Sequence, residues 1–456
     1  MKIVIEGAGQ VGSHLAKMLS AEGSEVTVID SDPGRVRALA STADVNTILA
    51  ATPSSVESLR EAGCANADLF IGVNPFTSQS VNVVSALLAK KLGTARVIAR
   101  VDKEDFLSPE NKILFKDMGL DMLFFPEKSA SDEIVDMLRH SASTESMDFA
   151  RGKLQISVFK LDDDSPLLDM RVMDFTKAVA EHNDAAEFRI VAISREGKTI
   201  IPKSDTPFKY GDYLYVIACR EGMPSLLKFL GKDQIDVRRV MILGASEIAQ
   251  MVTERLVSAN MEDIKIVEKN PERCKELSAI LPGYVNVVCG DARNADFLME
   301  ENLPAYQAVL AVTGNDELNI LSCVAAKKMG VPRVIAQVEN LEYIHLAEEM
   351  GVDSVINKKL ITAGRIFKFT LSDKVRSVRY MSGTDAEVLE YTAAPGSKIT
   401  KAPLKDLTFP SNAIIGGIIR GGEGLIAVGS THVEAYDRVA VFALPDSVKE
   451  IDKLFR

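Results

Sequence analysis

Cysteine and histidine are scarce in this chain, and neither is arranged as a set of ligands. The five cysteines are scattered without a C-x-x-C pair, and the five histidines show no spacing typical of a metal site. Zinc sites and disulfide frameworks need closely spaced ligands or paired cysteines. We therefore expect reduced, mostly buried thiols and no metal site.

Long apolar runs and an excess of positive charge are also missing. No apolar run approaches the roughly 18 residues that span a bilayer, and the N-terminus begins as a strand without a signal-peptide pattern. A formal net charge of −11 disfavours non-specific binding to nucleic acid or to anionic lipid. These absences predict a cytoplasmic protein that binds no nucleic acid and does not insert into a membrane.

An internal duplication accounts for most of the 456 residues. The hexapeptides "GAGQVG", from Gly7, and "GASEIA", from Gly244, lie 237 positions apart. The same offset, within one residue, relates three further pairs: Asp30 and Glu268, Asn82 and Asn319, Arg100 and Gln337. A constant offset is not expected by coincidence and indicates two copies of one architectural unit.

Each copy alternates short β-branched strands with helical stretches, which predicts a parallel, doubly wound sheet with right-handed crossovers. Helices of the first copy are expected to start near Val11, Pro33, Val56, Thr77 and Asp105. A β-rich segment follows each copy, with hairpin turns at "REGK" and "KYGD" after the first. The expected fold is α/β: two Rossmann-like doubly wound parallel-sheet domains, residues 1–128 and 236–358, each followed by a small α+β domain, residues 145–232 and 372–456. Amphipathic helices join the two domains of each pair, at residues 129–140 and 360–371.

The stretch "IVIEGAGQVGSHLAKML" contains G-x-G-x-x-G directly after a strand and at the start of a helix. In this context Gly7 permits the tight turn, Gly9 lets the backbone approach a pyrophosphate, and Gly12 allows close helix–sheet packing. Asp30 ends the second strand, where a carboxylate can accept both ribose hydroxyls of an adenosine. No Arg immediately follows Asp30 to contact a 2′-phosphate, so NAD(H) is favoured over NADP(H). The alternative is a glycine-rich turn on an empty Rossmann sheet.

Three polar residues end later strands on the same edge of the predicted sheet. Arg100 ends the fifth strand, and Thr52 and Asn74 follow the third and fourth. Ligands of doubly wound folds bind at this carboxyl edge. Arg100 is either a phosphate contact or a solvated surface arginine, and the other two are either ribose or nicotinamide contacts or turn formers.

The second copy keeps only one of the three glycines, Gly244. Ser246 places a side chain toward the phosphates, which either crowds a pyrophosphate or donates a hydroxyl to a smaller group. Glu268 could still hold a ribose, but Gln337 replaces the arginine of the first copy. We expect a weaker or different adenosine site here, with an empty fold as the alternative.

Motifs of catalysis are missing. The chain has no G-x-S-x-G, no Walker A motif and no H-E-x-x-H, and its histidines form no visible constellation with an acid. A dehydrogenase needs a proton-transfer residue beside its nicotinamide. The sequence therefore predicts nucleotide binding without catalysis, with an NAD-dependent oxidoreductase and a nucleotide-binding scaffold unrelated to ion transport as the alternatives.

The alternation of large α/β and small α+β domains, with "LREAG", "VIARV" and "GDYLYVI", closely resembles the TrkA family over essentially the whole chain. These are NAD-binding regulatory subunits of bacterial Trk potassium uptake systems, built from tandem RCK (regulator of potassium conductance) domains. The resemblance implies a cytoplasmic homo-oligomer, typically a tetramer, at the inner membrane beneath a TrkH-like potassium channel. It implies NAD(H) as the ligand, with ATP and ADP as further candidates, and regulation of channel activity by nucleotide.

The resemblance also places two nucleotide sites on named residues. The first comprises Gly7, Ala8, Gly9, Gln10, Val11, Asp30, Thr52, Asn74 and Arg100, and the motif itself adds Gly12. After its third and fourth strands the second copy keeps the more typical residues, with Asp291 in "CGDARN" and Thr313 in "VTGNDELN". The second site accordingly comprises Gly244, Ser246, Glu268, Asp291 and Thr313.

Overall fold

A computed structural model provides the fold of the chain. It describes residues 1–74, 80–140, 143–149, 152–182, 188–232, 235–367, 375–380, 384 and 386–456. The chain forms two compact units. The first unit is Met1–Ala130 with Lys358–Thr370, and the second is Ser131–Asn357 with Leu371–Arg456.

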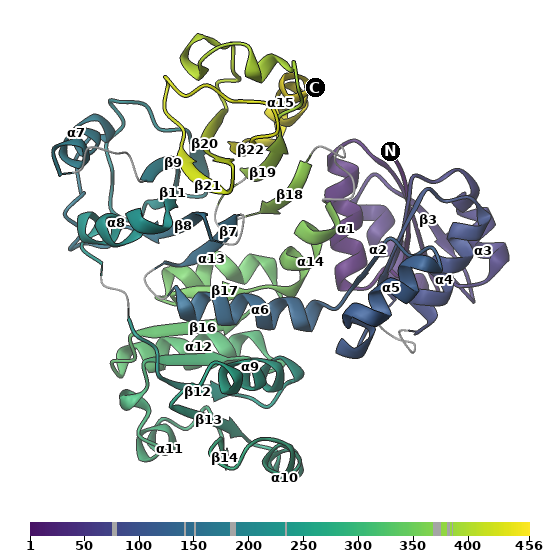
Figure 1. The fold of residues 1–456 in the computed structure, drawn as a ribbon. Helices are drawn as coiled ribbons and strands as arrows, with labels where there is room; N and C mark the ends of the chain where they lie inside the picture. The colour runs from purple at the N-terminus through teal and green to yellow at the C-terminus, as the bar shows by residue number, and fades with distance from the viewer. Residues whose placement is uncertain are drawn as a thin grey trace. The chain divides into compact units, whose positions relative to one another are not determined.

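The first unit is built on a parallel sheet with the strand order β3-β2-β1-β4-β5-β6 (Figure 1). The strands are β1 (Lys2–Glu6), β2 (Glu25–Asp30), β3 (Asn46–Leu49), β4 (Leu69–Gly72), β5 (Arg96–Arg100) and β6 (Met122–Phe124). The helices are α1 (Gln10–Ala21), α2 (Pro33–Thr42), α3 (Val56–Glu61), α4 (Ser80–Leu92), α5 (Pro109–Asp117), the start of α6 (Pro126–Arg139), and α14 (Lys358–Phe367). The central strands β1 and β4 are mostly apolar and are buried on both faces except at Lys2, as a parallel sheet covered by helices requires.

The strand order fixes where a ligand can bind in this unit. The chain runs from β1 outward to β3 and then returns to β4 on the other side of β1. The loops at the carboxyl ends of β1 and β4 diverge at this reversal, which is the usual ligand crevice of doubly wound folds.

The second unit contains a parallel sheet of the same order, β14-β13-β12-β15-β16-β17. Its strands are β12 (Arg239–Leu243), β13 (Asp263–Glu268), β14 (Asn286–Cys289), β15 (Ala308–Ala311), β16 (Arg333–Gln337) and β17 (Ser354–Ile356). Its helices are α9 (Glu247–Ser258), α10 (Pro271–Ile280), α11 (Ala295–Glu300), α12 (Asp316–Lys328) and α13 (Leu341–Glu349). The two large sheets thus share one topology, as the duplication predicts.

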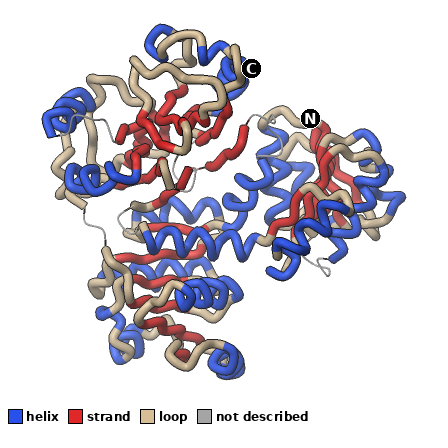
Figure 2. Tube along the Cα trace, viewed as in Figure 1, coloured by secondary structure: helices blue, strands red, loops and turns tan. Residues whose placement is uncertain are grey.

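Two antiparallel sheets complete the second unit (Figure 2). One, in the order β10-β9-β11-β8-β7, uses β7 (Glu145–Phe149), β8 (Leu154–Lys160), β9 (Phe188–Arg195), β10 (Lys198–Ile200) and β11 (Tyr213–Cys219), with helices α7 (Val172–His182) and α8 (Met223–Leu230). The other, in the order β18-β19-β22-β20-β21, uses β18 (Val375–Tyr380), β19 (Glu387–Thr392), β20 (Ala413–Arg420), β21 (Glu423–Ile426) and β22 (Arg438–Ala443), with helix α15 (Val448–Phe455).

The two antiparallel sheets pack against each other through a shared apolar core. Ile156 and Tyr215 of one sheet and Val388 and Phe442 of the other belong to a single buried cluster. The rings of Tyr215 and Phe442 lie 5.4 Å apart between centroids. The two small domains therefore bury their apolar faces on each other.

Neither connecting helix lies wholly in the same unit as the large sheet that precedes it in the chain. Helix α14 follows the second large sheet, but it belongs to the first unit and packs on α1 there. From Ser131 onward α6 belongs to the second unit, where Arg255 of α9 donates to the Ser131 hydroxyl at 2.6 Å and pairs with Asp132 at 3.0 Å. The sequence predicts both helices but not these partners.

The fold class expected from the sequence is confirmed. The helices expected near Val11, Pro33 and Val56 begin at Gln10, Pro33 and Val56. Thr77 lies outside the described residues, and α4 is described from Ser80. Near Asp105 the chain forms a short 3-10 helix, and α5 begins only at Pro109.

Candidate functional site

The turn after β1 brings the start of α1 directly against the sheet. Gly7 has a φ of +108°, and its N–H donates to the carbonyl of Ile29 at 2.8 Å. A Cβ on Gly7 would lie 2.9 Å from the backbone of Asn74, and a Cβ on Gly12 would lie 1.8 Å from the Gly7 carbonyl oxygen. Both positions therefore need glycine for steric reasons.

The N-terminus of α1 is open. Gly9 is its N-cap residue, and no side chain of the described residues caps the helix. The first turn of a helix presents unsatisfied N–H groups and the positive end of the dipole, a combination that binds phosphate. In the first copy the protein thus leaves this position free for a ligand.

Asp30 fastens the glycine turn to the second strand. One carboxylate oxygen accepts from the Ala8 N–H at 2.6 Å and the other from the Asp32 N–H at 2.7 Å. The residue is only 4% exposed. A carboxylate has about four acceptor positions, so each oxygen keeps one for a ribose hydroxyl. The predicted ribose acid is thus also part of the framework of the turn.

Arg35, which was not predicted as a site residue, lies beside this carboxylate. Nη1 of Arg35, on α2, is 3.8 Å from Asp30 Oδ1. In the second copy Arg273 occupies the same place, and its Nε donates to the Ala245 carbonyl at 3.1 Å. The signal was present in the sequence, because these arginines are related by the duplication offset. Arg35 adds positive charge to the cleft, although Asp30 would still repel a 2′-phosphate.

The other predicted rim residues differ in their surroundings. Thr52 is exposed, and its carbonyl accepts from Ser55 N–H and Ser58 Oγ, both at 3.0 Å, as in a turn. Arg100 is not a solvated surface arginine. Its Nη2 lies 3.4 Å from Glu127 Oε1, and its buried Nε has no hydrogen-bond partner among the described residues. Arg100 therefore keeps an unused donor at the carboxyl edge of the sheet.

The buried amide of Asn82 joins the ends of β4 and β5. Its Oδ1 accepts from the Asn74 N–H at 2.9 Å, and its Nδ2 donates to the carbonyls of Asn74 and Arg100, both at 3.2 Å. Asn319 does the same in the second copy, accepting from the Thr313 N–H at 3.0 Å and donating to the Gln337 carbonyl at 2.8 Å. The Asn pair found by the repeat search therefore holds the shape of each cleft.

We expect Asn82→Ala to lower the free energy of unfolding by about 2 kcal/mol, because it leaves buried backbone groups of two strand ends without partners. Differential scanning calorimetry of the full chain would measure the change. Asn319→Ala is the matched control, since it should destabilise the second copy while leaving nucleotide affinity of the first cleft unchanged. A wild-type melting profile for Asn82→Ala would contradict this role.

In the second cleft a side chain of the protein caps the helix N-terminus that follows the turn. Ser246 is the N-cap of α9, and its Oγ accepts from the Ala249 N–H at 3.3 Å. Glu268 repeats the arrangement of Asp30, accepting from the N–H groups of Ala245 and Asn270, both at 2.8 Å. Gly244 keeps the turn, with a φ of +99°. The fold of the turn is thus preserved, but the protein supplies its own cap to the helix.

Asp291 and Thr313 are also engaged by neighbouring residues. The Arg293 guanidinium and backbone N–H both hold Asp291 and lower the pKa of its carboxyl to about 2. The Thr313 hydroxyl donates to Asn319 Oδ1 at 2.6 Å. These two predicted site residues therefore lie at the rim with part of their hydrogen-bonding capacity already used.

One ionisable group lies under the first glycine turn and was not singled out from the sequence. Glu6, the last residue of β1, is fully buried, and neither carboxylate oxygen has a hydrogen-bond partner among the described residues. Burial raises the pKa of Glu6 to about 7; the nearby Ser85 hydroxyl, which makes no hydrogen bond to it in the structure, opposes this in part, and the charge of Asp30 reinforces it. The corresponding residue of the second copy is Leu243, so the two copies differ in sequence at this position.

The described part of the chain has no group of three or more histidine, cysteine or acidic side chains placed to hold a metal ion. Within the same residues no helix is long and apolar enough to cross a membrane.

The sequence matches models of two domain types that together cover most of the chain. The TrkA-N domain matches residues 3–126 and 240–358, and the TrkA-C domain matches residues 156–231 and 388–456. The Trk system potassium uptake protein TrkA homolog of Archaeoglobus fulgidus is 34% identical, with 100% of each chain covered. The TrkA of Halomonas elongata is 32% identical, covering 100% of this chain and 99% of that protein. This chain belongs to the TrkA family.

Solved structures give the same architecture to this TrkA-family chain. The crystal structure of the GsuK RCK domain has a TM-score of 0.60 and 16% identity, covering 100% of this chain and 94% of that one. The GsuK channel bound to NAD also has a TM-score of 0.60, with 17% identity, and covers 100% of this chain and 78% of that one. The family and the tandem RCK fold predicted from the sequence are both confirmed.

Proposed function

We propose that this chain is the nucleotide-binding regulatory subunit of a Trk-type potassium uptake system, and that its first cleft is the principal sensor. The observation that carries the proposal is the open N-terminus of α1 beneath the Gly7 turn, with Asp30 beside it. In its TrkA-family relatives the protein name itself refers to potassium uptake. A regulatory protein needs a ligand that binds its conformational states unequally, and a nucleotide bound at this turn could supply that difference.

NAD(H) is the ligand that we propose for the first cleft, with ATP and ADP as further candidates. All of them share the adenosine and phosphate groups that Asp30 and the α1 N-terminus would bind. Solved GsuK structures of the same fold are described as bound to NAD and to ADP. The first site in this proposal comprises Gly7, Ala8, Gly9, Gln10, Val11, Gly12, Asp30, Thr52, Asn74 and Arg100.

The second cleft is proposed as a weaker or different adenosine site, comprising Gly244, Ser246, Glu268, Asp291 and Thr313. Ser246 uses its oxygen as the helix cap but keeps a hydroxyl proton to donate to a phosphate. Gln337 stands where Arg100 supplies a cation in the first copy. Less positive charge and a self-capped helix both favour lower affinity for a pyrophosphate.

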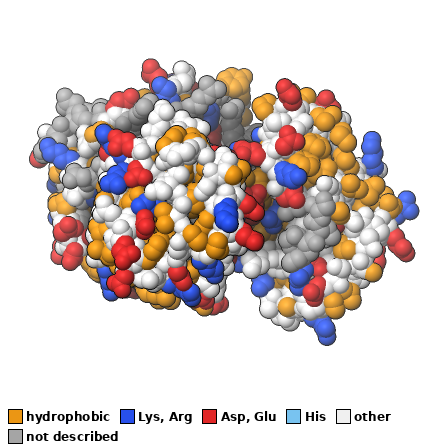
Figure 3. Space-filling model, turned by 90° about the horizontal axis from the view of Figure 1, so that it is seen from below, with side chains coloured by type: hydrophobic (Ala, Val, Ile, Leu, Met, Phe, Trp, Pro, Cys, Tyr) orange, Lys and Arg blue, Asp and Glu red, His pale blue; other side chains and the backbone are white. Residues whose placement is uncertain are grey.

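The remaining parts of the proposal follow the family. The chain acts as a homo-oligomer, typically a tetramer, at the cytoplasmic side of a TrkH-like channel, without a catalytic step of its own. The domain boundaries expected from the sequence, 1–128, 145–232, 236–358 and 372–456, remain part of this proposal. Acidic and basic side chains are interspersed on the face in Figure 3, which suits a protein partner better than a nucleic acid.

Calorimetric titration tests the ligand and the number of sites. NADH, NAD+, ATP and ADP are titrated into the full-length protein, into Asp30→Ala and into Glu268→Ala. Loss of a charge-assisted contact is expected to weaken nucleotide binding roughly tenfold to a hundredfold in Asp30→Ala. Glu268→Ala is the matched control from the duplication and should leave the tightest binding unchanged. Equal affinities of all three proteins would contradict the assignment of the first cleft.

Potassium flux separates the proposed function from its alternatives. Proteoliposomes containing a TrkH-like channel should change their potassium flux when wild-type protein and nucleotide are added together. A nucleotide-binding scaffold would leave potassium flux unchanged. An oxidoreductase would oxidise NADH in the presence of a suitable substrate, and the NADH absorbance would fall. The proposal would be overturned if, in the presence of this protein, potassium flux were the same with and without nucleotide.

A further inference from the structure

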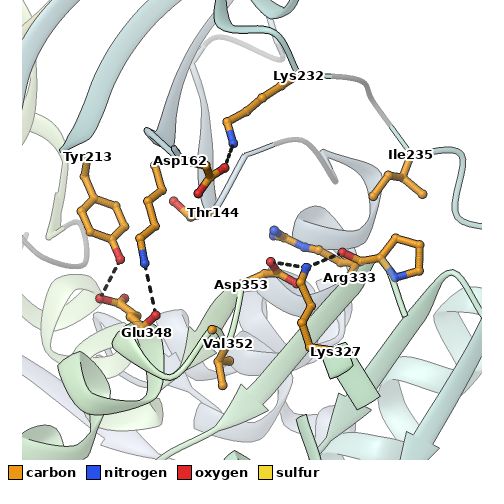
Figure 4. Close-up of a pocket in the computed structure, with 13 residues that line it drawn as sticks. Thr144, Asp162, Tyr213, Lys232, Ile235, Lys327, Arg333, Glu348, Val352 and Asp353 are labelled. Atoms are coloured by element: carbon orange, nitrogen blue, oxygen red, sulfur yellow. Dashed lines mark hydrogen bonds and ion pairs between the residues drawn. The ribbon is translucent and has the colours of Figure 1, made fainter. Parts of the chain in front are cut away.

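A polar cavity of about 370 Å³ lies inside the second unit, away from the nucleotide cleft of that unit. Its walls come from β8 and β11 of the first small domain and from the amino ends of β16 and β17 of the second Rossmann-like sheet (Figure 4). The nucleotide cleft occupies the opposite, carboxyl edge of that sheet. The cavity is within the size range of small-molecule sites in proteins.

Most charges around the cavity are already paired. Lys327 Nζ lies 2.7 Å from Asp353 Oδ1, and Lys232 Nζ lies 2.6 Å from Asp162 Oδ2. The duplication explains the first pair as part of the fold. In the first copy Lys90 pairs with Asp121 at 3.1 Å, and that aspartate accepts a backbone N–H as Asp353 does. These paired groups shape the cavity but leave its other cations to be explained.

Arg333 is the exceptional group of this cavity. It is 4% exposed; its Nη2 donates to the Ser354 hydroxyl at 2.8 Å, and its buried Nε has no hydrogen-bond partner among the described residues. Burial lowers the pKa of Arg333, which the charge of Asp353 opposes. A buried guanidinium with an unused donor is costly, and an oxyanion would supply both the missing acceptor and the missing counter-charge.

A second cation lies on the other side of the same space. Figure 4 shows Tyr213 and Glu348 facing Arg333 across the cavity. Lys160 lies on the Tyr213 side, with its Nζ 5.6 Å from the centre of that ring and 3.2 Å from the Glu348 carbonyl oxygen. Lys160 has no carboxylate within ion-pair distance among the described residues. Burial raises the pKa of the nearby Glu348, and the charges of His345 and Lys160 oppose this increase.

We propose that this cavity binds the oxyanion group, a carboxylate or a phosphate, of a small metabolite, with Arg333 as the principal donor and Lys160 on the facing wall. The planar guanidinium fork matches both groups in geometry. A ligand held between these residues bridges the small domain and the Rossmann-like domain. It would therefore act on the same unit as the second nucleotide cleft without competing for that cleft.

Titration of the full-length protein with inorganic phosphate and with succinate tests the proposal. At least one probe should bind by calorimetry, and its affinity should fall tenfold or more in both Arg333→Met and Lys160→Met. Methionine keeps the length and apolar stem of either side chain, so folding should survive the loss of charge. Binding of phosphate alone identifies a phosphorylated ligand, whereas binding of succinate identifies a carboxylate.

Arg96→Met is the matched control for this experiment. Arg96 holds the place of Arg333 in the first copy but does not line the cavity. Its replacement should leave the affinity for the probe unchanged. The proposal is overturned if neither probe binds the wild-type protein, or if binding persists unchanged in Arg333→Met and Lys160→Met, which would place the anion elsewhere, such as at the open end of α1.

Discussion

Gly12→Ala should abolish nucleotide binding in the first cleft. The added Cβ would lie 1.8 Å from the Gly7 carbonyl oxygen and 3.1 Å from a methyl group of Val73. Gly7 cannot move away from the added methyl group, because its N–H donates to the Ile29 carbonyl and the backbone of Asn74 lies directly beside it. Helix α1 must therefore move away and take its N-terminal donors with it. We expect an affinity loss of at least about a hundredfold, and about 3 kcal/mol or more of overpacking strain.

The second copy supplies the matched control for this substitution. Ala249 stands in the place of Gly12 and is a buried residue of α9, so the second copy accepts alanine at this position. Ala249→Gly should cost at most about 1 kcal/mol and leave the first cleft unaffected. Calorimetric titration with NADH and thermal unfolding of both variants provide the measurements. Near-wild-type affinity in Gly12→Ala would show that the turn does not carry the phosphate site.

The architecture was predictable because its signals are local and repeated. The G-x-G-x-x-G turn between a strand and a helix, and the recurrence of Asp30 as Glu268, indicate the topology before any contact is known. Most strands of the large sheets are short apolar runs between helical stretches, a pattern that predicts buried parallel strands. The constant offset then lets the clear motif of the first copy identify the corresponding but less typical turn and strand end in the second copy.

The contacts that give each cleft its properties were less predictable, because they join residues far apart in the chain. The repeat marks Asn82, but only the structure shows that its amide joins the ends of β4 and β5. The packing of α14 on α1 brings together segments that are far apart in the sequence. The sequence leaves Arg100 as either a phosphate contact or a solvated surface arginine, and only the structure shows Glu127 beside it. Burial and pairing of this kind depend on tertiary structure, which composition and periodicity do not describe.

Glu6 is the residue whose behaviour depends most on such burial, and it predicts an unusual pH dependence of stability. A glutamate ordinarily has a pKa of 4.5, whereas burial raises that of Glu6 to about 7 in the folded protein. Between these two values the folded chain holds a proton that the unfolded chain releases. Stability should therefore fall as the pH rises from about 4.5 to 7 and stay low above that. At about 1.4 kcal/mol per pH unit, the loss amounts to roughly 3 kcal/mol.

Glu6→Leu should remove this pH dependence, and the second copy shows that leucine fits. Leu243, at the corresponding end of β12, is fully buried. The variant should gain roughly 3 kcal/mol over wild type at pH 8 and much less at pH 5, as measured by urea unfolding at each pH. Glu25→Gln, at the exposed first residue of β2, is the control and should keep the wild-type slope. Parallel pH profiles for the wild type and Glu6→Leu would mean that Glu6 is charged in the folded protein throughout this range, and that its carboxylate finds a partner beneath the Gly7 turn.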